Sequence, residues 1–262
     1  MLSPGQLHAA SDFLWRLWSE GWRTDELPQE FRPTTRAEGY AVQALVERRS
    51  TKPLFGWKIA ATSTAGQAHI NVDGPLAGRL LAEKAFSSGA ALPFGANHMR
   101  VAEAEFAFRF PIGLPRRAYD YTLDEVMAAV GSLLPAIEVP DSRFNDFARV
   151  GVPQLIADAA CACWFVLGSA SDSLWRERDL ITHAVNVYRN GEPEASGSGA
   201  NVLGDPRVAL TWLVNELRVY GDGIQPGQFV TTGTCVIPVP IAPGDTIRAD
   251  FGDLGFVETI LI

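Results

Sequence analysis

The sequence predicts an α+β protein in which a helical N-terminal region, residues 1–53, precedes a β-rich core, residues 54–262. The first fifty residues carry capped helical patterns, whereas from Leu54 onward short apolar runs alternate with Gly and Pro, as in strands and turns. The later helical segments are not regularly interleaved with strands, which argues against a doubly wound parallel sheet. A chain of 262 residues exceeds the ~150 residues of an average domain by less than twofold, so we expect one compact unit.

Composition excludes several classes of protein. The chain is 47% apolar and 20% charged, which is globular rather than disordered usage. Its net charge of −8 opposes binding to a nucleic-acid backbone, which needs a basic footprint. The longest near-apolar stretch, residues 159–168, is about half the length of a membrane span, and no signal peptide is visible at the N-terminus. With three cysteines that cannot all pair, we expect a soluble, reduced, cytoplasmic protein.

Four helices are predicted from capping signals and helical periodicity. Ser3 with Gln6, and Thr35 with Glu38, form capping boxes that open the two N-terminal helices. A third capping box, Thr122 with Glu125, opens a helix whose expected buried face runs through Val126, Val130, Leu133 and Leu134. The fourth helix begins at Asp205-Pro206 and is expected to end at Gly221. Everything after Gly227 reads as strand and turn.

The segment 100–110 alternates strictly between apolar and charged residues, as a half-buried strand does. Glu103 and Glu105 fall on one face, with backbones roughly 6–7 Å apart at a ~3.3 Å rise per residue. Their carboxylates could therefore converge on one cation. The simpler alternative is an acidic strand face that lies in water.

A third carboxylate favours the cation site. Glu138 lies in the apolar stretch 135–140, where an unpaired carboxylate is costly unless a cation or metal compensates it. Three carboxylates suit Mg²⁺ or Mn²⁺ better than zinc. No histidine spacing competes, because the four histidines are scattered and each is expected to be a surface or satisfied core residue: His8, His69, His98 and His183.

Lys58 lies between Trp57 and Ile59 in a strand that otherwise reads as buried. One interpretation is an edge-strand lysine whose amine reaches water. The other is a cation beside the metal site, with Gly56 on the same face leaving space for a ligand. The Gly/Ser-rich stretch 195–204 could present backbone N–H groups to an anion, but such stretches are commonly plain loops.

An ordered set of motifs carries a family resemblance. The set comprises Gly-Trp-Lys-Ile-Ala-Ala-Thr-Ser (56–63), Val-Asp-Gly-Pro (72–75), Glu-Ala-Glu (103–105), Pro-Ala-Ile-Glu-Val (135–139), Gly-x-Gly-Ala-x-x-Leu-Gly-x-Pro (197–206) and Pro-Gly-Asp (243–245). In this order the chain resembles the 2-oxopent-4-enoate hydratase and 4-oxalocrotonate decarboxylase family of the fumarylacetoacetate hydrolase superfamily. The resemblance runs from about residue 54 to the C-terminus.

The resemblance implies a fold, a cofactor and a site. The fold is a mixed, rolled β-sheet core of the superfamily's C-terminal type, usually in a homo-oligomer. Glu103, Glu105 and Glu138 match the family's Mg²⁺ or Mn²⁺ ligands, and Lys58 matches its active-site lysine. The substrate would be a small 2-oxo acid, with no nucleic-acid or membrane partner. The remaining pocket residues are expected to be Thr62, Ser63, Leu76, Asp141, Cys161, Thr232 and Gly233.

The implied function is a metal-dependent lyase of aromatic-compound catabolism, acting on a 2-oxo or 2-hydroxydienoic acid through a metal-bound enolate. A 2-keto-4-pentenoate-type hydratase is favoured. The alternatives are a 4-oxalocrotonate-type decarboxylase, another carbon–carbon bond-cleaving member of the superfamily, or a non-catalytic partner subunit of a hydratase–decarboxylase complex. The Glu–His pair of the superfamily's hydrolases has no evident place in this sequence.

Two departures from the family pattern make the pocket less polar. In the hydratases that the chain resembles, Val-Asp-x-Pro is commonly followed by Asp, whereas Leu76 stands here. The family's Ala-Asp-Asn-Ala-Ser stretch is replaced by residues 157–161, in which Ala159 and Cys161 remove an amide and a hydroxyl. Leucine cannot move a proton, so we expect a substrate with an apolar distal substituent, longer than the minimal five-carbon acid.

Overall fold

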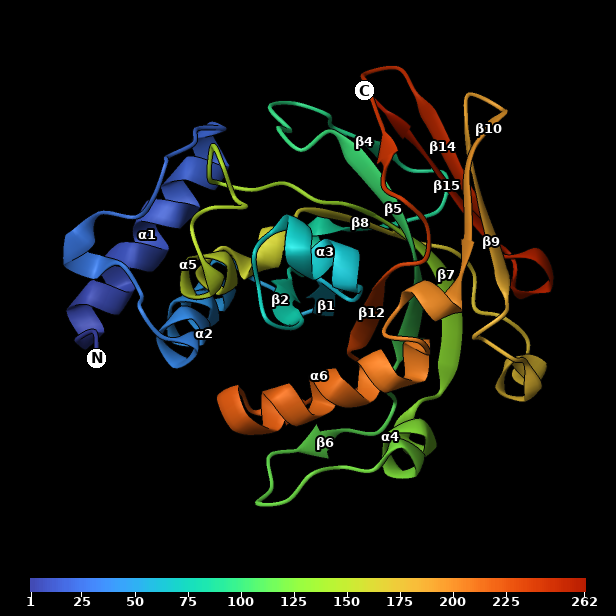
Figure 1. The fold of residues 1–262 in the computed structure, drawn as a ribbon, viewed down its shortest axis with the longest axis horizontal. Helices are drawn as coiled ribbons and strands as arrows, with labels where there is room; N and C mark the ends of the chain where they lie inside the picture. Colours follow the sequence, from blue (N-terminus) through green and yellow to red (C-terminus); the bar gives the residue numbers. More distant parts are fainter.

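The computed structural model describes the backbone of residues 1–262 and all side chains except that of Ser173. Its N-terminal part is helical, with α1 (Pro4–Glu20), α2 (Arg36–Ala44) and two 3₁₀ turns. The two capping boxes predicted for these N-terminal helices are present, because the side chains of Ser3 and Thr35 each accept from the third backbone N–H of their helix. These helices lie at one end of the molecule, where α2 packs against α5 (Val152–Ala157) (Figure 1).

A mixed sheet of eight strands forms the centre. Along its main path the strands are ordered β2-β1-β12-β5-β7-β8-β3, and β13 pairs with one end of β5. The pairs β1–β12 and β3–β8 are parallel and the others antiparallel. The bounds are β1 (Gly56–Ala60), β2 (Leu76–Leu80), β3 (Ala85–Ser87), β5 (Val101–Arg109), β7 (Ser132–Val139), β8 (Trp164–Leu167), β12 (Phe229–Thr234) and β13 (Val239–Pro240).

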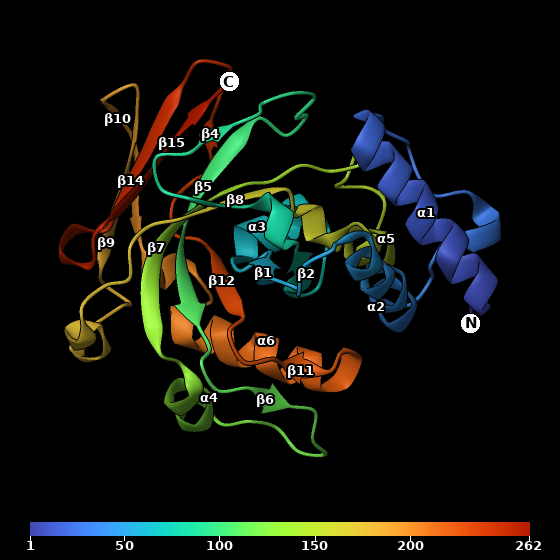
Figure 2. The ribbon, with the colours of Figure 1, turned by 180° about the vertical axis from the view of Figure 1, so that it is seen from behind.

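A second sheet of five strands, ordered β10-β9-β14-β15-β4, stands at the end opposite α1 (Figures 1 and 2). Helix α6 (Pro206–Tyr220) packs against β12, and the short helix α3 (Thr64–His69) follows β1. The mixed helices and curled sheet match the predicted fold class. The bounds of the remaining strands are β4 (Ala91–Leu92), β6 (Leu114–Pro115), β9 (Ala184–Arg189), β10 (Glu192–Ser198), β11 (Gly223–Ile224), β14 (Thr246–Asp250) and β15 (Phe256–Leu261).

The third predicted helix is shorter than the sequence pattern indicated. Helix α4 covers only Leu123–Ala129, and Leu133 and Leu134 belong to β7 instead. Gly131 ends the helical run, because its N–H donates to the carbonyl of Arg109 at 2.8 Å and starts the pairing of β7 with β5. Both leucines are buried although they point to opposite faces, since β7 is a central strand covered on both sides. Such a run has no periodicity that separates helix from strand.

Within the described residues, no helix combines the length and apolar character that crossing a membrane requires. The main core is continuous from α2 through both sheets, because Tyr40 of α2, Phe106 of β5 and Val257 of β15 belong to one buried apolar cluster. Ala10 and Leu14 of α1 belong to a separate, smaller cluster.

Candidate functional site

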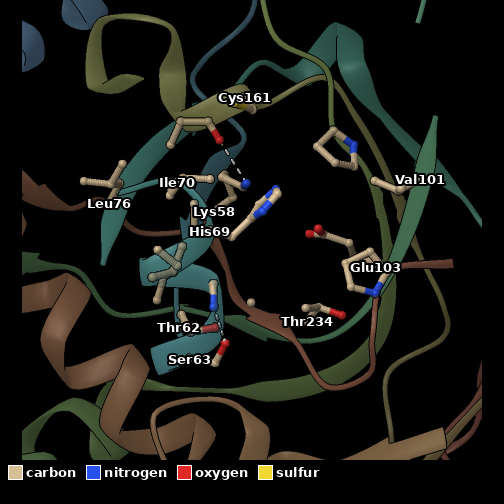
Figure 3. Close-up of a pocket in the computed structure, with 18 of the residues that line it drawn as sticks. Lys58, Thr62, Ser63, His69, Ile70, Leu76, Val101, Glu103, Cys161 and Thr234 are labelled. Atoms are coloured by element: carbon tan, nitrogen blue, oxygen red, sulfur yellow. Dashed lines mark hydrogen bonds between the residues drawn. The ribbon is translucent and has the colours of Figure 1, made fainter. Parts of the chain in front are cut away.

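Three glutamates meet where β5 and β7 pair. Glu103 lies directly opposite Glu138 in the antiparallel register, and Glu105 lies two residues along the same face of β5. One carboxylate oxygen from each side chain falls within 4.8 Å of the other two. Glu105 and Glu138 are fully buried, whereas Glu103 is half-buried and points into a cavity (Figure 3).

The electrostatics of this cluster are unfavourable without a cation. The pKa of Glu103 is raised to about 7, mainly by burial and secondly by the carboxylate of Glu138. The pKa of Glu105 is also raised to about 7, mainly by burial and secondly by the carboxylate of Glu103. Burial also raises the pKa of Glu138 to about 8, against the opposing effect of Lys58. Among the described side chains, one oxygen of Glu105 and both oxygens of Glu138 have no hydrogen-bond partner of good geometry. Buried, unpartnered carboxylate oxygens are the donor set that a hard divalent cation such as Mg²⁺ or Mn²⁺ takes.

Among the described side chains, Lys58 is the one cation paired with this cluster. It lies on β1, is only 3% exposed, and its Nζ is 3.2 Å from Oε1 of Glu138. Burial lowers the pKa of Lys58, but the carboxylates of Glu138, Glu103 and Glu105 outweigh burial and leave that pKa raised. Nζ also donates to the carbonyl of Ala160 at 3.0 Å. An ammonium group has three donors. One is bonded to Ala160 and the charge faces Glu138 as an ion pair, so at least one N–H remains for a group in the cavity.

The space around Lys58 depends on Gly78 rather than on Gly56. A Cβ at position 56 would lie 1.9 Å from the carbonyl oxygen of Phe229, so Gly56 allows β1 and β12 to approach and leaves no room for a ligand. Gly78 is the cross-strand partner of Lys58. A Cβ there would lie 2.0 Å from the carbonyl oxygen of Ala159 and 3.0 Å from Cγ of Lys58.

The carbonyl that binds Lys58 comes from an unusual turn. Ala159, Ala160 and Cys161 have φ angles of 50°, 49° and 63°, a left-handed conformation that is costly for non-glycine residues. A fully buried ion pair flanks the turn: Arg143 bonds the carboxylate of Asp158 and donates to the carbonyl of Ala162 at 3.1 Å. This pair holds the turn in the conformation that directs the carbonyl of Ala160 toward Lys58.

A cavity of about 660 Å³ opens in front of Lys58 and Glu103. Five of the predicted pocket residues line it: Thr62, Ser63, Leu76 and Cys161, which are labelled in Figure 3, and Gly233. The structure does not bring the other two to its wall. The hydroxyl of the fully buried Thr232 donates to the carbonyl of Phe106 at 3.2 Å. The carboxylate of Asp141 is paired with Arg23 and accepts from the backbone N–H of His98 at 2.8 Å.

His69, expected from the sequence to be a surface or satisfied core residue, lines the same cavity. It is the last residue of α3, exposed at the rim, with its ring 6.1 Å from the ring of Phe147. Ser63, which accepts from the backbone N–H of Gly66 at 3.0 Å, caps this helix. That N-cap signal was the feature that could have placed a short helix, and His69 with it, beside the end of β1. Asn201, from the Gly/Ser-rich stretch, also lines the cavity.

The fold of this chain resembles those of solved enzyme structures. No family model matches the chain. One similar structure is that of 4-oxalocrotonate decarboxylase from Pseudomonas putida G7, complexed with magnesium and adipate. The two chains are 29% identical and superpose with a TM-score of 0.90. The match covers 100% of this chain and 99% of the decarboxylase. Fumarylpyruvate hydrolase from Pseudomonas aeruginosa shares the fold alone, at 14% identity and a TM-score of 0.59 over 79% of this chain and 88% of that one. The rolled sheet with its acidic pocket therefore defines the class of protein: an enzyme with the fumarylacetoacetate hydrolase fold.

Relatives that are similar in sequence indicate which family of this fold the chain belongs to. The 4-oxalocrotonate decarboxylase of Pseudomonas sp. (strain CF600) is 30% identical over 242 residues, which are 90% of this chain and 89% of the relative. The 2-keto-4-pentenoate hydratase of Paraburkholderia xenovorans (strain LB400) is 29% identical over 98% of this chain and 96% of its own length. The chain belongs to the family of 2-keto-4-pentenoate hydratases and 4-oxalocrotonate decarboxylases.

Proposed function

We propose that the protein is a Mg²⁺- or Mn²⁺-dependent lyase that converts a small 2-oxo or 2-hydroxydienoic acid through its enolate, and that it is a hydratase. The observation that carries this is the trio Glu103, Glu105 and Glu138, in which one oxygen of Glu105 and both oxygens of Glu138 lack hydrogen-bond partners, beside a charged Lys58 on the cavity wall. The three glutamates would hold the cation. When bound, the cation would act as a Lewis acid that stabilises negative charge developing on substrate oxygen.

Lys58 would act on the substrate directly. Its Nζ is fixed by the carbonyl of Ala160 and the carboxylate of Glu138, so the remaining N–H has a defined direction into the cavity. A cation held in a buried position stabilises an oxyanion more strongly than the same cation does in water. We therefore assign Lys58 to the 2-oxo group, where its positive charge stabilises the enolate that forms when carbon 3 loses a proton.

The distal half of the reaction needs a different group. A hydratase must protonate the chain and deliver water to carbon 4, and Leu76 can do neither. Burial raises the pKa of the Cys161 thiol to about 12, so this side chain stays neutral and unreactive as a base. The remaining protonatable side chain among the described lining residues, apart from Lys58 and Glu103, is His69. We assign His69 to the distal proton and water step, since neutral imidazole is an effective general base near pH 7.

Product analysis distinguishes this proposal from its alternatives. The protein is incubated with 2-hydroxypenta-2,4-dienoate and, separately, with 4-oxalocrotonate, with Mg²⁺ or with chelator, and loss of the conjugated chromophore is followed in the ultraviolet. A hydratase yields a 4-hydroxy-2-oxo acid, and a decarboxylase releases carbon dioxide from the second substrate. Decarboxylation without hydration would replace the hydratase assignment. No Mg²⁺-dependent change with either substrate, together with no Mg²⁺-dependent deuterium exchange at carbon 3 of a short or a long 2-oxo acid, would favour a non-catalytic partner subunit. The homo-oligomeric state and cytoplasmic location remain predictions.

A further inference from the structure

The cavity is large for the small acids that this family's names describe. Its volume of about 660 Å³ lies in the middle of the ~300–1,000 Å³ range of pockets that enclose drug-sized ligands. It equals roughly twenty water molecules at ~30 Å³ each, whereas a five-carbon acid fills the space of a few. A substrate of that size, held at the glutamates and Lys58, would leave most of the cavity unfilled.

The wall beyond Lys58 is apolar. Leu76 is fully buried and is the cross-strand partner of Ala60. Ala60 lies two residues after Lys58 on β1, so Leu76 and Lys58 are on the same face of the sheet. In the close-up Leu76 lies on the side of Lys58 away from Glu103, with Ile70 beside it (Figure 3). The cavity lining also includes large apolar side chains from other parts of the chain: Met99, Phe147, Leu155 and Val236.

Charge on the wall is limited to the proximal end. Among the lining residues that the structure describes there is no arginine, and Lys58 is the one lysine. That lysine already faces three glutamates and lies 3.2 Å from Glu138. A second carboxylate on the substrate would therefore enter a largely apolar region in which no arginine and no second lysine among the described lining residues could pair with it, and a buried, unpaired carboxylate is strongly disfavoured.

From these observations we propose that the substrate is a monocarboxylate: a 2-hydroxydienoic or 2-oxo acid whose distal end carries an alkyl or aryl group of several carbons, and not a second carboxylate. The proposal rests on the proposed function, because the proximal end of the substrate is placed by the glutamates and Lys58. The solved decarboxylase from Pseudomonas putida G7 is complexed with adipate, a dicarboxylate; the present chain would discriminate against such a ligand.

Binding of three saturated 2-oxo acids tests this proposal without requiring turnover. Calorimetry in Mg²⁺ compares 2-oxopentanoate, 2-oxooctanoate and 2-oxooctanedioate, the last two differing only in the distal carboxylate. Each buried methylene should increase the binding affinity about fourfold. With three more methylenes, 2-oxooctanoate should therefore bind roughly 10- to 60-fold more tightly than 2-oxopentanoate. The dicarboxylate should bind at least about tenfold more weakly than 2-oxooctanoate, as expected for a buried charge without a partner. Equal or tighter binding of the dicarboxylate, or affinity independent of chain length, would overturn the proposal.

A variant pair locates the preference on the wall. Leu76→Asn should remove most of the advantage of 2-oxooctanoate, whereas the apolar control Leu76→Met should keep it. If Leu76→Asn does not fold, the wild-type series decides alone. Mg²⁺-dependent deuterium exchange at carbon 3, measured by NMR on the same acids, separates the two levels of inference. Exchange without the chain-length preference refutes the substrate class only, whereas no exchange and no Mg²⁺-dependent binding for any acid refutes the proposed function and the substrate class with it.

Discussion

Replacing Glu105 by glutamine should stabilise the metal-free protein and, at the same time, remove most of its response to Mg²⁺. Glu105 is fully buried, with one oxygen accepting from the backbone N–H of Gly233 at 2.9 Å and the other oxygen without a partner. Glutamine has the same shape and keeps an acceptor for Gly233. Its amide can also donate to the neighbouring carboxylates of Glu103 or Glu138, which the ionised Glu105 only repels.

The size of the effect follows from the pKa. Burial and the neighbouring carboxylate of Glu103 raise the pKa of Glu105 from 4.5 to about 7. Keeping the carboxylate ionised at pH 7 therefore costs the folded protein roughly 3 kcal/mol, at ~1.4 kcal/mol per pH unit. Allowing for relaxation around the new amide, we expect a gain of about 2 kcal/mol, which raises Tm by about 4–8 °C for a chain of this size. Because the folded-state pKa is raised, the cost is absent below about pH 4.5 and complete above about pH 7, so the advantage of glutamine grows across that window.

Thermal unfolding in chelator and in Mg²⁺, at pH 5 and pH 8, measures both effects. Saturation to 100 times Kd would stabilise the wild type by about 2.7 kcal/mol, so at pH 8 the variant should be more stable in chelator and show little further gain in Mg²⁺. Glu192→Gln, at an exposed position at the start of β10, is the matched control and should change neither. A Glu105→Gln variant that is less stable than wild type in chelator at pH 8, and that still gains fully from Mg²⁺, would refute the reasoning.

Three further substitutions test other parts of the site. Lys58→Met should fold normally but lose roughly two orders of magnitude or more in kcat, the usual scale for a positioned acid–base or electrostatic group; wild-type turnover would remove Lys58 from the mechanism. His69→Gln should slow hydration by about tenfold or more while deuterium exchange at carbon 3 continues, and equal losses in both assays would contradict its distal role. Gly78→Ala should destabilise the protein by about 1–3 kcal/mol and lower kcat, since the new Cβ would lie 2.0 Å from the carbonyl oxygen of Ala159. Gly74→Ala, where a Cβ meets nothing within 4 Å, is its control, and equal stability of the two variants would contradict the crowding at Gly78.

The features that the sequence predicts well are those with a local physical signature. The alternation around Glu103 and Glu105 identifies a strand and its acidic face, and the apolar surroundings of Glu138 mark a carboxylate that needs compensation. The helix caps at Ser3 and Thr35 are equally local, and both are present. The sequence alone does not pair β5 with β7, yet it is this pairing that sets Glu138 opposite Glu103.

What the sequence does not predict depends on contacts between distant segments. Leu133 and Leu134 could belong to a helix or to a central strand until their neighbours are known. The role of Gly56 is decided by the backbone of Phe229, and that of Gly78 by the carbonyl of Ala159, neither of which is near in sequence. His69 reaches the cavity from the last residue of α3, the short helix that follows β1. Asp141 lies two residues after the end of β7, but its carboxylate forms an ion pair with Arg23 of the N-terminal region and does not line the cavity.

The central claim is that the three glutamates and Lys58 together generate the substrate enolate. Deuterium exchange at carbon 3 of 2-oxopentanoate, followed by proton NMR in D₂O, measures this step without requiring hydration or decarboxylation. The account predicts exchange by the wild type in Mg²⁺, none above background in chelator, and a loss of about 100-fold or more in Lys58→Met. Exchange that is independent of Mg²⁺, or that is unchanged in Lys58→Met, would contradict it.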